Sequence, residues 1–208
     1  MIETIGINHF KNMFDAAFIE VKQNEQLFSQ MDAQTGDGDH GTAIVTALNA
    51  VNESMKQATD LKLMFNDAGF AAMSEACGST STLIGAWLMG MYDGVGTDQI
   101  DASGVANIFR AGLTNVQKQT GAGLGDKTIM DALIPAVLAL ESNQDAGITT
   151  MFTAASEAAN KGAEKTKGMI AKFGRAKNLG EKVIGFIDPG AASMACIFGS
   201  FEKGIKRL

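Results

Sequence analysis

Residues 80–92 read Thr-Ser-Thr-Leu-Ile-Gly-Ala-Trp-Leu-Met-Gly-Met-Tyr, and most of this stretch is apolar. On a helix of 3.6 residues per turn its large side chains would point in nearly every direction; they are Leu83, Ile84, Trp87, Leu88, Met89 and Met91. A helix without a polar face is stable only when other elements surround it. The stretch therefore predicts the central helix of a helical protein.

Apolar residues repeat with a helical period on both sides of this stretch. The pattern predicts helices over residues 6–30, 42–57 and 61–77, a helix capped by Asp101 or Ser103, helices over 127–142 and 148–167, and a last helix that starts after Pro189-Gly190 and runs to about residue 206. The apolar stripe over 6–30 includes Leu27, and the stripe over 61–77 includes Leu63 and Phe70. Pro135 lies inside a predicted helix, so we expect a bend there or a helix that tolerates a missing N–H donor.

Strand signals are weak in this chain. Runs of β-branched residues are short, and a glycine interrupts the nearest strand candidate, residues 183–187. Glycine-rich loops separate the helical patterns, and no internal repeat or linker divides them. We therefore expect an all-α fold in a single domain over residues 1–208, built from about eight helices whose neighbours run antiparallel. Loops at one end of such a bundle could meet on one rim.

Composition excludes several classes of function. The net charge is −6 and charged residues make up 19 %, with no Lys/Arg-rich patch, so we expect no nucleic-acid partner. No run of 18 apolar residues predicts a membrane span, and Glu3 stands where a signal peptide would be basic and then apolar. Cys77 and Cys196 lie among small apolar residues and are typical of core positions in a reducing compartment, so we expect a cytoplasmic protein.

Residues 32–41 read Asp-Ala-Gln-Thr-Gly-Asp-Gly-Asp-His-Gly. Asp32, Asp37 and Asp39 repel one another at neutral pH unless a cation lies among them, and Mg²⁺ prefers such oxygen ligands. The glycines allow sharp turns and close approach to a ligand. His40 then opens a helical stretch, whose N-terminus favours phosphate. The segment indicates a metal and phosphate site, and the alternative from these residues alone is an ordinary solvent loop.

Three further segments have both a functional and a structural interpretation. Residues 125–133 begin Gly-Asp-Lys-Thr and resemble the end of a phosphate-binding P-loop, but Asp126 replaces the required glycine and no strand precedes it, so a helix cap is the alternative. Arg175, flanked by Gly174 and Ala176, has room to approach an anion, or is simply a solvated loop residue. Residues 77–82 are small and hydroxylated and could hold phosphate oxygens or serve as an N-cap.

Together and in this order, the motifs resemble those of the nucleotide-binding L subunit (DhaL) of dihydroxyacetone kinases. The shared pattern is G-D-G-D-H-G, a Gly/Ser loop, G-D-K-T-x-x-D-A-L-x-P and then G-R-A…L-G-E…D-P-G-A, from residue 32 to about 193. The resemblance implies a barrel of eight antiparallel helices that holds a nucleotide at one end. Residues 77–83 depart from the Gly-Gly-Ala-Ser-Gly-Pro-Leu that the family commonly has.

The resemblance also implies roles for individual residues. The ligands of two Mg²⁺ ions would be Asp32, Asp37 and Asp39. The phosphates would be lined by His40, Gly41, Thr42 and Ala43, with Ser79 and Thr80 on the opposite loop. Adenine would lie near Thr120 or Gly121 and near Ile129. The nucleotide pocket would be closed by Arg175, Asp188, Pro189 and Gly190. Arg175 would also stabilise the phosphoryl group in transfer.

The implied activity is that of a phosphotransferase subunit whose ADP or ATP, bound with Mg²⁺, donates phosphate to a ketose held on a separate K subunit. ADP would remain bound and be rephosphorylated by a phosphohistidine M subunit of the phosphotransferase system; in the alternative branch ATP is consumed. Two other functions stay open. One is an L subunit for another short ketose such as erythrulose, and the other is a regulatory module that senses nucleotide without turnover. A homodimer also stays open.

Overall fold

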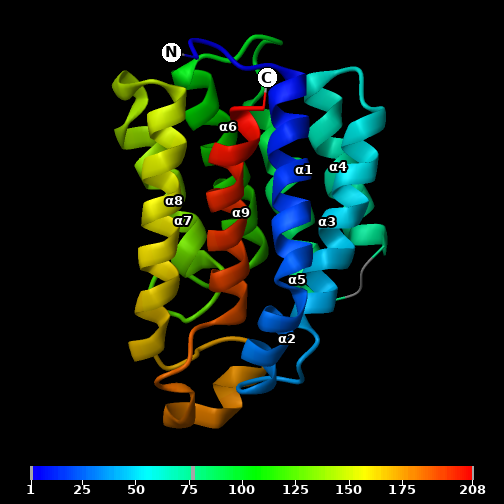
Figure 1. Ribbon diagram of the computed structural model, residues 1–208. Helices are drawn as coiled ribbons and strands as arrows, with labels where there is room; N and C mark the ends of the chain where they lie inside the picture. Colours follow the sequence, from blue (N-terminus) through cyan, green and yellow to red (C-terminus); the bar gives the residue numbers. More distant parts are fainter. Residues whose placement is uncertain (1, 76–77, 208) are drawn as a thin grey trace.

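The computed structural model describes residues 2–75 and 78–207, and within them the chain is mainly helical (Figure 1). The α-helices are α1 (Ile7–Gln23), α2 (Glu25–Ala33), α3 (His40–Gln57), α4 (Leu61–Glu75), α5 (Ser79–Gly94), α6 (Ala102–Gln119), α7 (Met130–Ser142), α8 (Ile148–Lys165) and α9 (Pro189–Ile205). Three 3₁₀ segments follow α7 and α8, namely η1 (Gln144–Ala146), η2 (Thr166–Gly168) and η3 (Arg175–Val183). Among the described residues, the one β-bridge joins Ile5 and Ile100, so the all-α prediction is confirmed.

The larger helices form a closed ring. Each packs against the next in the order α1, α3, α4, α5, α6, α7, α8, α9, and α9 returns to α1. Neighbours in the ring run antiparallel, as predicted (Figure 1). As a result α3, α5, α7 and α9 all begin at the same end, where α2 and η3 also lie, while the two termini lie at the opposite end.

Aromatic residues fill the centre of the ring. Trp87 of α5 is fully buried, but α5 is a member of the ring between α4 and α6 and is not the central helix, enclosed by the others, that the sequence predicted. The Trp87 ring centroid lies 6.1 Å from that of Phe14 on α1, 5.9 Å from that of Phe109 on α6, and 5.9 and 6.3 Å from those of Phe198 and Phe201 on α9. Such pairs add to the stability already gained from burying their large apolar area. The core therefore joins helices from opposite sides of the ring.

Two predicted apolar stripes are wrong in detail. The helix expected over 6–30 is broken at Asn24, whose side-chain amide donates to the Glu20 carbonyl at 2.8 Å and ends α1. Because α2 restarts with a new phase, Phe28 is buried and Leu27 is 45 % exposed. On α4, Leu63 and Phe70 point away from α3 and α5 and are 52 % and 67 % exposed.

Pro135 lies inside α7, as the sequence predicts. A proline at this position cannot donate to the carbonyl of Asp131, one turn earlier. Gly162 of α8 packs directly over that carbonyl, since a Cβ built on Gly162 would lie only 2.0 Å from the Asp131 oxygen. The missing donor is thus tolerated because α8 approaches closely at a glycine, an approach that allows a weak Cα–H···O contact.

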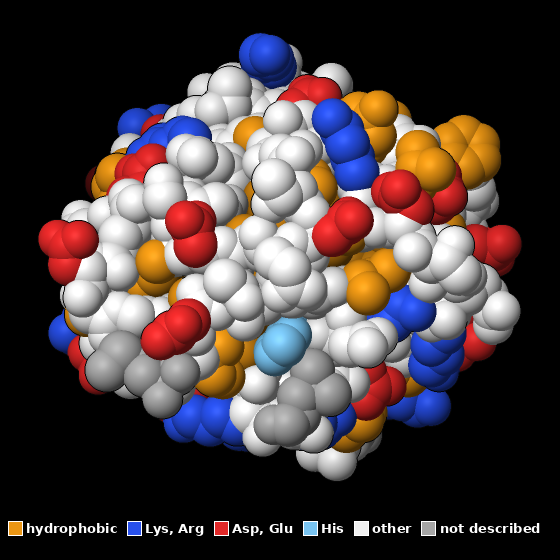
Figure 2. All heavy atoms as spheres, turned by 90° about the horizontal axis from the view of Figure 1, so that it is seen from above, with side chains coloured by type: hydrophobic (Ala, Val, Ile, Leu, Met, Phe, Trp, Pro, Cys, Tyr) orange, Lys and Arg blue, Asp and Glu red, His pale blue; other side chains and the backbone are white. Residues whose placement is uncertain are grey.

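The surface and the cysteines add little that is specific. None of the described helices combines the length and apolar character needed to cross a membrane. At the end that carries the termini, acidic and basic side chains are intermingled across the described surface (Figure 2). Cys196 is partly buried against the core, and burial raises the pKa of its thiol to about 11. The prediction for Cys77 falls outside the described residues.

Candidate functional site

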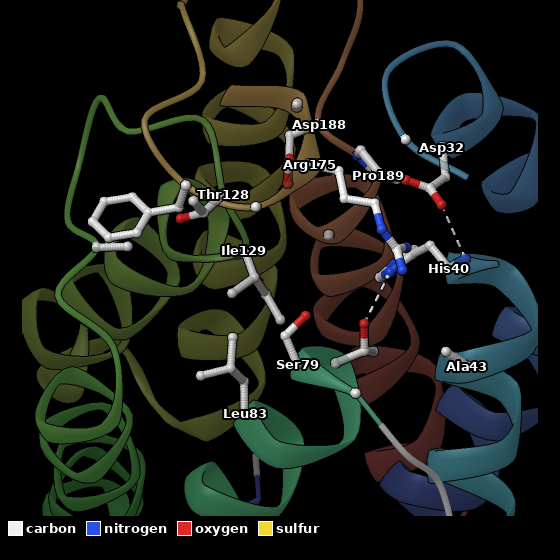
Figure 3. Close-up of a pocket in the computed structure, with 18 of the residues that line it drawn as sticks. Asp32, His40, Ala43, Ser79, Leu83, Thr128, Ile129, Arg175, Asp188 and Pro189 are labelled. Atoms are coloured by element: carbon white, nitrogen blue, oxygen red, sulfur yellow. Dashed lines mark hydrogen bonds between the residues drawn. The ribbon is translucent and has the colours of Figure 1, made fainter. Parts of the chain in front are cut away.

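A cavity of about 710 Å³ opens at the end of the ring where four helices begin (Figure 3). It is lined by the loop between α2 and α3, the start of α5, residues 119–130, residues 173–178 and the start of α9. Its volume is in the range of cavities that bind small-molecule ligands and cofactors. The rim of converging loops that the sequence predicted is thus present at one end of the bundle.

Four helix N-termini meet at this cavity. His40 of α3, Ser79 of α5, Met130 of α7 and Pro189 of α9 are each the first residue of their helix, and all four line it. The first turn of an α-helix has backbone N–H groups without intrahelical acceptors and carries a partial positive charge. A cavity on which four such turns converge is suited to a ligand with several negative charges, such as a polyphosphate.

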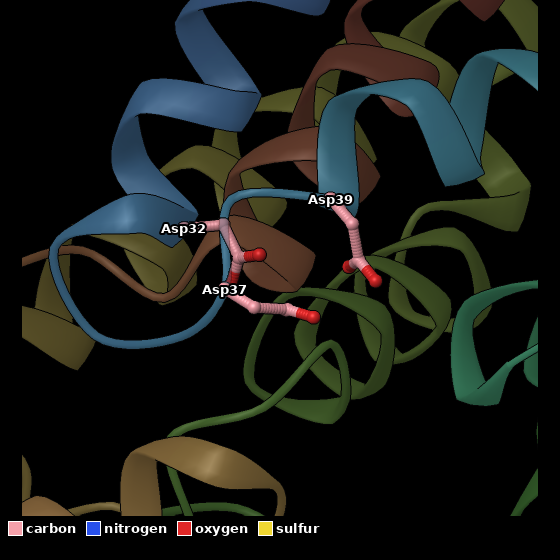
Figure 4. Close-up of side chains that lie close together, drawn as sticks. All are labelled: Asp32, Asp37 and Asp39. Atoms are coloured by element: carbon pink, nitrogen blue, oxygen red, sulfur yellow. The ribbon is translucent and has the colours of Figure 1, made fainter.

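The three predicted aspartates converge on the same side of the cavity (Figure 4). One carboxylate oxygen from each of Asp32, Asp37 and Asp39 lies within 4.8 Å of the others. Asp32 is held in place because its Oδ2 accepts from the amides of Gly38 at 2.9 Å and His40 at 3.3 Å. A Cβ on Gly36 would lie 2.4 Å from Asp32 Oδ1, so a larger residue there would displace this carboxylate. The donor set, carboxylate oxygens with room for further ligands, fits Mg²⁺.

Arg175 supplies positive charge to this carboxylate cluster. Its guanidinium pairs with Asp37 and lies 3.6 Å from Asp39. Because the Arg175 side chain is 65 % exposed, the pairs are screened by water and add little to stability. They place the one arginine of the pocket rim beside the carboxylates and within reach of any anion bound there.

His40 joins three helices rather than facing the cavity freely. Its Nδ1 lies 3.2 Å from Thr80 Oγ1 on α5, and its Nε2 lies 2.9 Å from Ser193 Oγ on α9. The Ser193 hydroxyl donates to the Gly190 carbonyl at 3.1 Å, so it accepts from His40 Nε2, and Nδ1 accepts from Thr80. Burial lowers the pKa of His40, although Asp32 and Asp39 oppose this shift. We infer a neutral imidazole that orients Thr80.

Asp188 caps α9 beside the cavity. Its carboxylate accepts from the Ala191 amide at 2.7 Å, and Pro189 occupies the first helical position, where its missing donor is not needed. Burial raises the pKa of Asp188 to about 7, against the stabilising effects of the Ala191 amide and of Lys127. α9 therefore begins at Pro189, earlier than the start after Pro189-Gly190 that the sequence predicts, and this segment is part of the cavity wall.

The opposite side of the cavity is apolar. Leu83 and Ile129 face each other there, away from Asp32 and His40, with Arg175 between the two sides (Figure 3). Phe173 and Thr128 also line the cavity. A ligand with an aromatic ring at one end and anionic groups at the other would match this division.

Most of the predicted site residues come together, and three do not line the cavity. Those that line it are Asp32, Asp37, Asp39, His40, Ala43, Ser79, Thr80, Thr120, Ile129, Arg175, Asp188, Pro189 and Gly190. Gly41 instead faces α2, since a Cβ on it would lie 2.1 Å from the Glu25 carbonyl oxygen. Thr42 donates to the Glu25 carboxylate at 3.1 Å, and Gly121 is exposed near Phe173.

Some lining residues were not assigned from the sequence. Lys127 and Thr128 lie in the Gly-Asp-Lys-Thr segment, for which the sequence predicts a helix cap as the alternative to a P-loop. Its position at the start of α7 was the available signal. Phe173 directly precedes Gly174-Arg175, and Leu83 belongs to the apolar helix α5. No chemical feature of either residue distinguishes it from a core position.

The DAK2 domain matches residues 34–203 of this chain. The chain is 35 % identical over 180 residues to the PEP-dependent dihydroxyacetone kinase 1, ADP-binding subunit DhaL, of Listeria innocua, an alignment that covers 86 % of each protein. It is 34 % identical to L-erythrulose 1-kinase of Mycolicibacterium smegmatis, over 88 % of this chain and 33 % of that kinase. Its fold is similar to the crystal structure of the dihydroxyacetone kinase from C. freundii in complex with AMP-PNP and Mg²⁺, with a TM-score of 0.72, 23 % identity and coverage of 93 % of this chain and 33 % of that one.

Proposed function

This chain belongs to the DAK2 domain family, and from that premise we propose that it is the nucleotide-binding, phosphoryl-donor subunit of a dihydroxyacetone kinase. The observation that carries the proposal is the cavity itself, in which three carboxylates and four helix N-termini face one space of about 710 Å³. Carboxylates alone would suit a metal, and N-termini alone an anion. Both together suit a nucleotide whose phosphates carry Mg²⁺.

The proposed orientation of the nucleotide follows from the two sides of the cavity. The base would lie against Ile129 and Leu83, near Thr120 and the more distant Gly121, and the phosphates would lie beside His40, Ala43, Ser79 and Thr80. Gly41 and Thr42, which do not line the cavity, would act by holding the first turn of α3 against α2. The Listeria relative is named an ADP-binding subunit, which supports a nucleoside diphosphate as the proposed ligand.

Asp32, Asp37 and Asp39 would hold two Mg²⁺ ions, which when bound neutralise charge on the phosphate oxygens. The helix N-termini would donate backbone hydrogen bonds to the same oxygens, and Arg175 would stabilise charge on the phosphoryl group as it leaves the donor oxygen for an acceptor hydroxyl. Asp188, Pro189 and Gly190 would fix the wall from which α9 starts. Phosphoryl transfer requires little covalent chemistry from the protein, so these residues contribute mainly by positioning the phosphates and by stabilising their negative charge.

The ketose would be held by a separate K subunit, because the cavity residues we assign are all committed to the nucleotide. We propose that ADP stays bound and is rephosphorylated to ATP by a phosphohistidine M subunit, and that this ATP donates the phosphoryl group and returns to ADP, in line with the PEP-dependent name of the relative that this chain matches over 86 % of its length. We also propose that residues 1–208 form a single domain, since α9 closes the ring against α1. A cytoplasmic location is likewise proposed, as the sequence predicts.

A second candidate acceptor is a four-carbon ketose. The Mycolicibacterium relative is an L-erythrulose 1-kinase of which this chain matches about one third. An L-type domain of the same architecture would then donate phosphate from ATP to erythrulose on a different K partner. Assays with both ketoses, a purified K subunit and either ATP or a phosphohistidine donor separate the two acceptors and the two donors.

The nucleotide itself is tested by denaturing the purified protein and identifying what is released. Stoichiometric ADP supports the proposed coenzyme role, whereas an empty site with reversible ATP binding supports the ATP-dependent branch. Retained nucleotide without transfer to any ketose, with any K partner, would instead support a nucleotide-sensing module. Protein that neither contains nor binds nucleotide would contradict the proposal.

A further inference from the structure

A buried lysine lies beside the base of the segment that carries Arg175. Lys127 is 2 % exposed, and in the described part of the chain it is the one non-glycine residue with a left-handed φ, +58°. This backbone conformation is unfavourable for residues with a side chain. Burying an ammonium is also unfavourable unless hydrogen bonds replace those to water. Two unfavourable features at one residue require compensating contacts in the folded protein.

The compensating contacts are made with both ends of one segment. The Lys127 ammonium donates to the Thr166 carbonyl at 2.6 Å and also to the Phe186 carbonyl. These two residues lie near the beginning and the end of residues 166–188, the segment that leaves α8 and returns to α9. Further bonds close the same base: the Asp188 amide donates to Thr166 Oγ1 at 2.9 Å, and the Gly185 amide to the Lys167 carbonyl at 2.7 Å.

Between these ends the segment is largely exposed, yet it supplies one wall of the cavity. Phe173, Gly174, Arg175 and Asn178 line the cavity from this segment, and η3 lies at the outer end of the molecule (Figure 1). Two further hydrogen bonds join the segment to residues 120–129, since Lys172 donates through its backbone amide and its ammonium to Asp126, at 3.1 and 2.6 Å. The Lys172 side chain is 63 % exposed, so that ion pair is weak.

We propose that Lys127 is a positioning residue, which closes the base of residues 166–188 and thereby places Arg175 over the cavity. Among the described residues outside the segment, Lys127 is the one whose side chain donates hydrogen bonds to both ends of it. Burial lowers the pKa of Lys127, and the nearby carboxyl groups of Asp188 and Asp131 oppose this shift. The catalytic consequence rests on the proposed function, in which Arg175 acts on the phosphoryl group; the structural consequence does not.

The test compares two substitutions with a matched control. Lys127→Met keeps the apolar stem and removes the donors, and Lys127→Gly also relieves the left-handed backbone. The control is Lys11→Met, because the Lys11 ammonium likewise donates to two backbone carbonyls, of Lys56 at 3.3 Å and Ala58 at 2.7 Å, which lie at the C-terminal end of α3, the end away from the cavity. Hydrogen exchange is measured on the whole, ligand-free protein.

Both Lys127 variants should exchange the amides of residues 169–187 at least about tenfold faster than wild type, because hydrogen bonds to a charged group are lost from the base. The Lys11 variant should leave that segment unchanged. Exchange that is unchanged in both folded Lys127 variants overturns the proposal. So does faster exchange spread equally over α5 and α9, which would show that Lys127 supports the whole bundle.

A double-mutant cycle tests the link to Arg175. If Lys127 acts through Arg175, Lys127→Met should slow phosphoryl transfer, and adding it to Arg175→Met should cause little further loss. If the rate loss in the double variant equals the product of the losses in the two single variants, Lys127 acts independently of Arg175 and the positioning role is overturned. If wild type transfers no phosphate at all, the proposed function fails, while the exchange experiment still decides whether Lys127 closes the segment.

Discussion

The guanidinium of Arg175 pairs with the carboxylate of Asp37 across the mouth of the cavity. The two residues come from different walls, Arg175 from the start of η3 and Asp37 from the loop between α2 and α3. The pair brings positive charge to a carboxylate cluster that would otherwise repel itself. Mg²⁺ held by these carboxylates as proposed would supply this positive charge instead, and Arg175 would then be free to pair with the phosphates.

Arg175→Met should therefore affect transfer far more than binding. The rate of phosphoryl transfer should fall by at least about a hundredfold, in line with the contribution of arginines that stabilise transferring phosphoryl groups. The affinity for Mg²⁺–ADP should change little, because the aspartates and helix N-termini remain. Lys177→Met, which removes an exposed cation from the same 3₁₀ segment, is the control and should leave both quantities near wild type. Equal transfer rates in the two variants would contradict the role of Arg175.

His40→Ala should destabilise the fold as well as the site. The substitution leaves Ser193, which is fully buried, without its imidazole partner and also frees Thr80. A lost buried hydrogen-bond partner costs about 1–3 kcal/mol of the free energy of unfolding, measured by urea denaturation. His9→Ala removes the other histidine of the chain, whose Nδ1 accepts from the Gly6 amide at 3.1 Å away from the cavity. A larger loss for His9→Ala than for His40→Ala would contradict the account of His40.

Gly162→Ala and Gly199→Ala should have opposite effects on stability. The added methyl on Gly162 would overlap the Asp131 carbonyl oxygen and force α7 and α8 apart. Overpacking of this kind costs about 1–3 kcal/mol. A methyl on Gly199 meets only Ser156 Oγ at 3.5 Å, an ordinary contact, so the higher helix propensity of alanine should stabilise that variant by up to about 1 kcal/mol. Thermal unfolding measures both, and a neutral Gly162→Ala would contradict the close approach.

Asp188 should make stability depend on pH. Its pKa is raised to about 7 in the folded protein, compared with about 3.9 for an unfolded chain. As pH rises from about 4 to about 7, the unfolded chain releases a proton that the folded chain keeps, so the free energy of unfolding falls through this window. Asp188→Asn has no such proton and retains an amide oxygen that can cap α9.

The measurement is urea denaturation of wild type and Asp188→Asn at about pH 5 and about pH 8. The difference between the two proteins should shift in favour of the variant at the higher pH, because only wild type then carries a buried charge at this position. Other titrating groups are shared and cancel in the comparison. Parallel pH profiles for the two proteins would show that Asp188 titrates normally.

The helices could be predicted from the sequence because each one buries a stripe against two neighbours, and the period of apolar residues records that burial. The pattern failed where a single residue reset the phase, at Asn24, and where apolar residues sit off the stripe, as Phe70 does. The periodicity of apolar residues does not record either effect. The break at Asn24 depends on a side-chain hydrogen bond, and the exposure of Phe70 depends on which face of α4 its neighbouring helices cover.

The location of the cavity could be predicted from the sequence, but the hydrogen bonds that position its residues could not. Glycine-rich loops in a known order indicated one rim, and the acidic loop indicated the metal side. The role of Lys127 could not be read from the Gly-Asp-Lys-Thr segment, because its acceptors, the carbonyls of Thr166 and Phe186, lie 39 and 59 positions further along the chain. Likewise the sequence did not show that Thr42 would turn toward Glu25 and away from the cavity.

The central claim is that the carboxylate cluster binds the nucleotide through Mg²⁺. It is tested most directly by calorimetric titration of ADP, with Mg²⁺ and with a chelator, into Asp37→Asn/Asp39→Asn and into a control of equal charge, Asp93→Asn/Asp98→Asn, whose exposed carboxylates lie at and beyond the far end of α5. We predict that wild type and the control bind ADP in Mg²⁺ and lose most of that affinity in the chelator, while the double variant binds weakly in both. ADP binding by the double variant as tight and as Mg²⁺-dependent as that of wild type would contradict the claim.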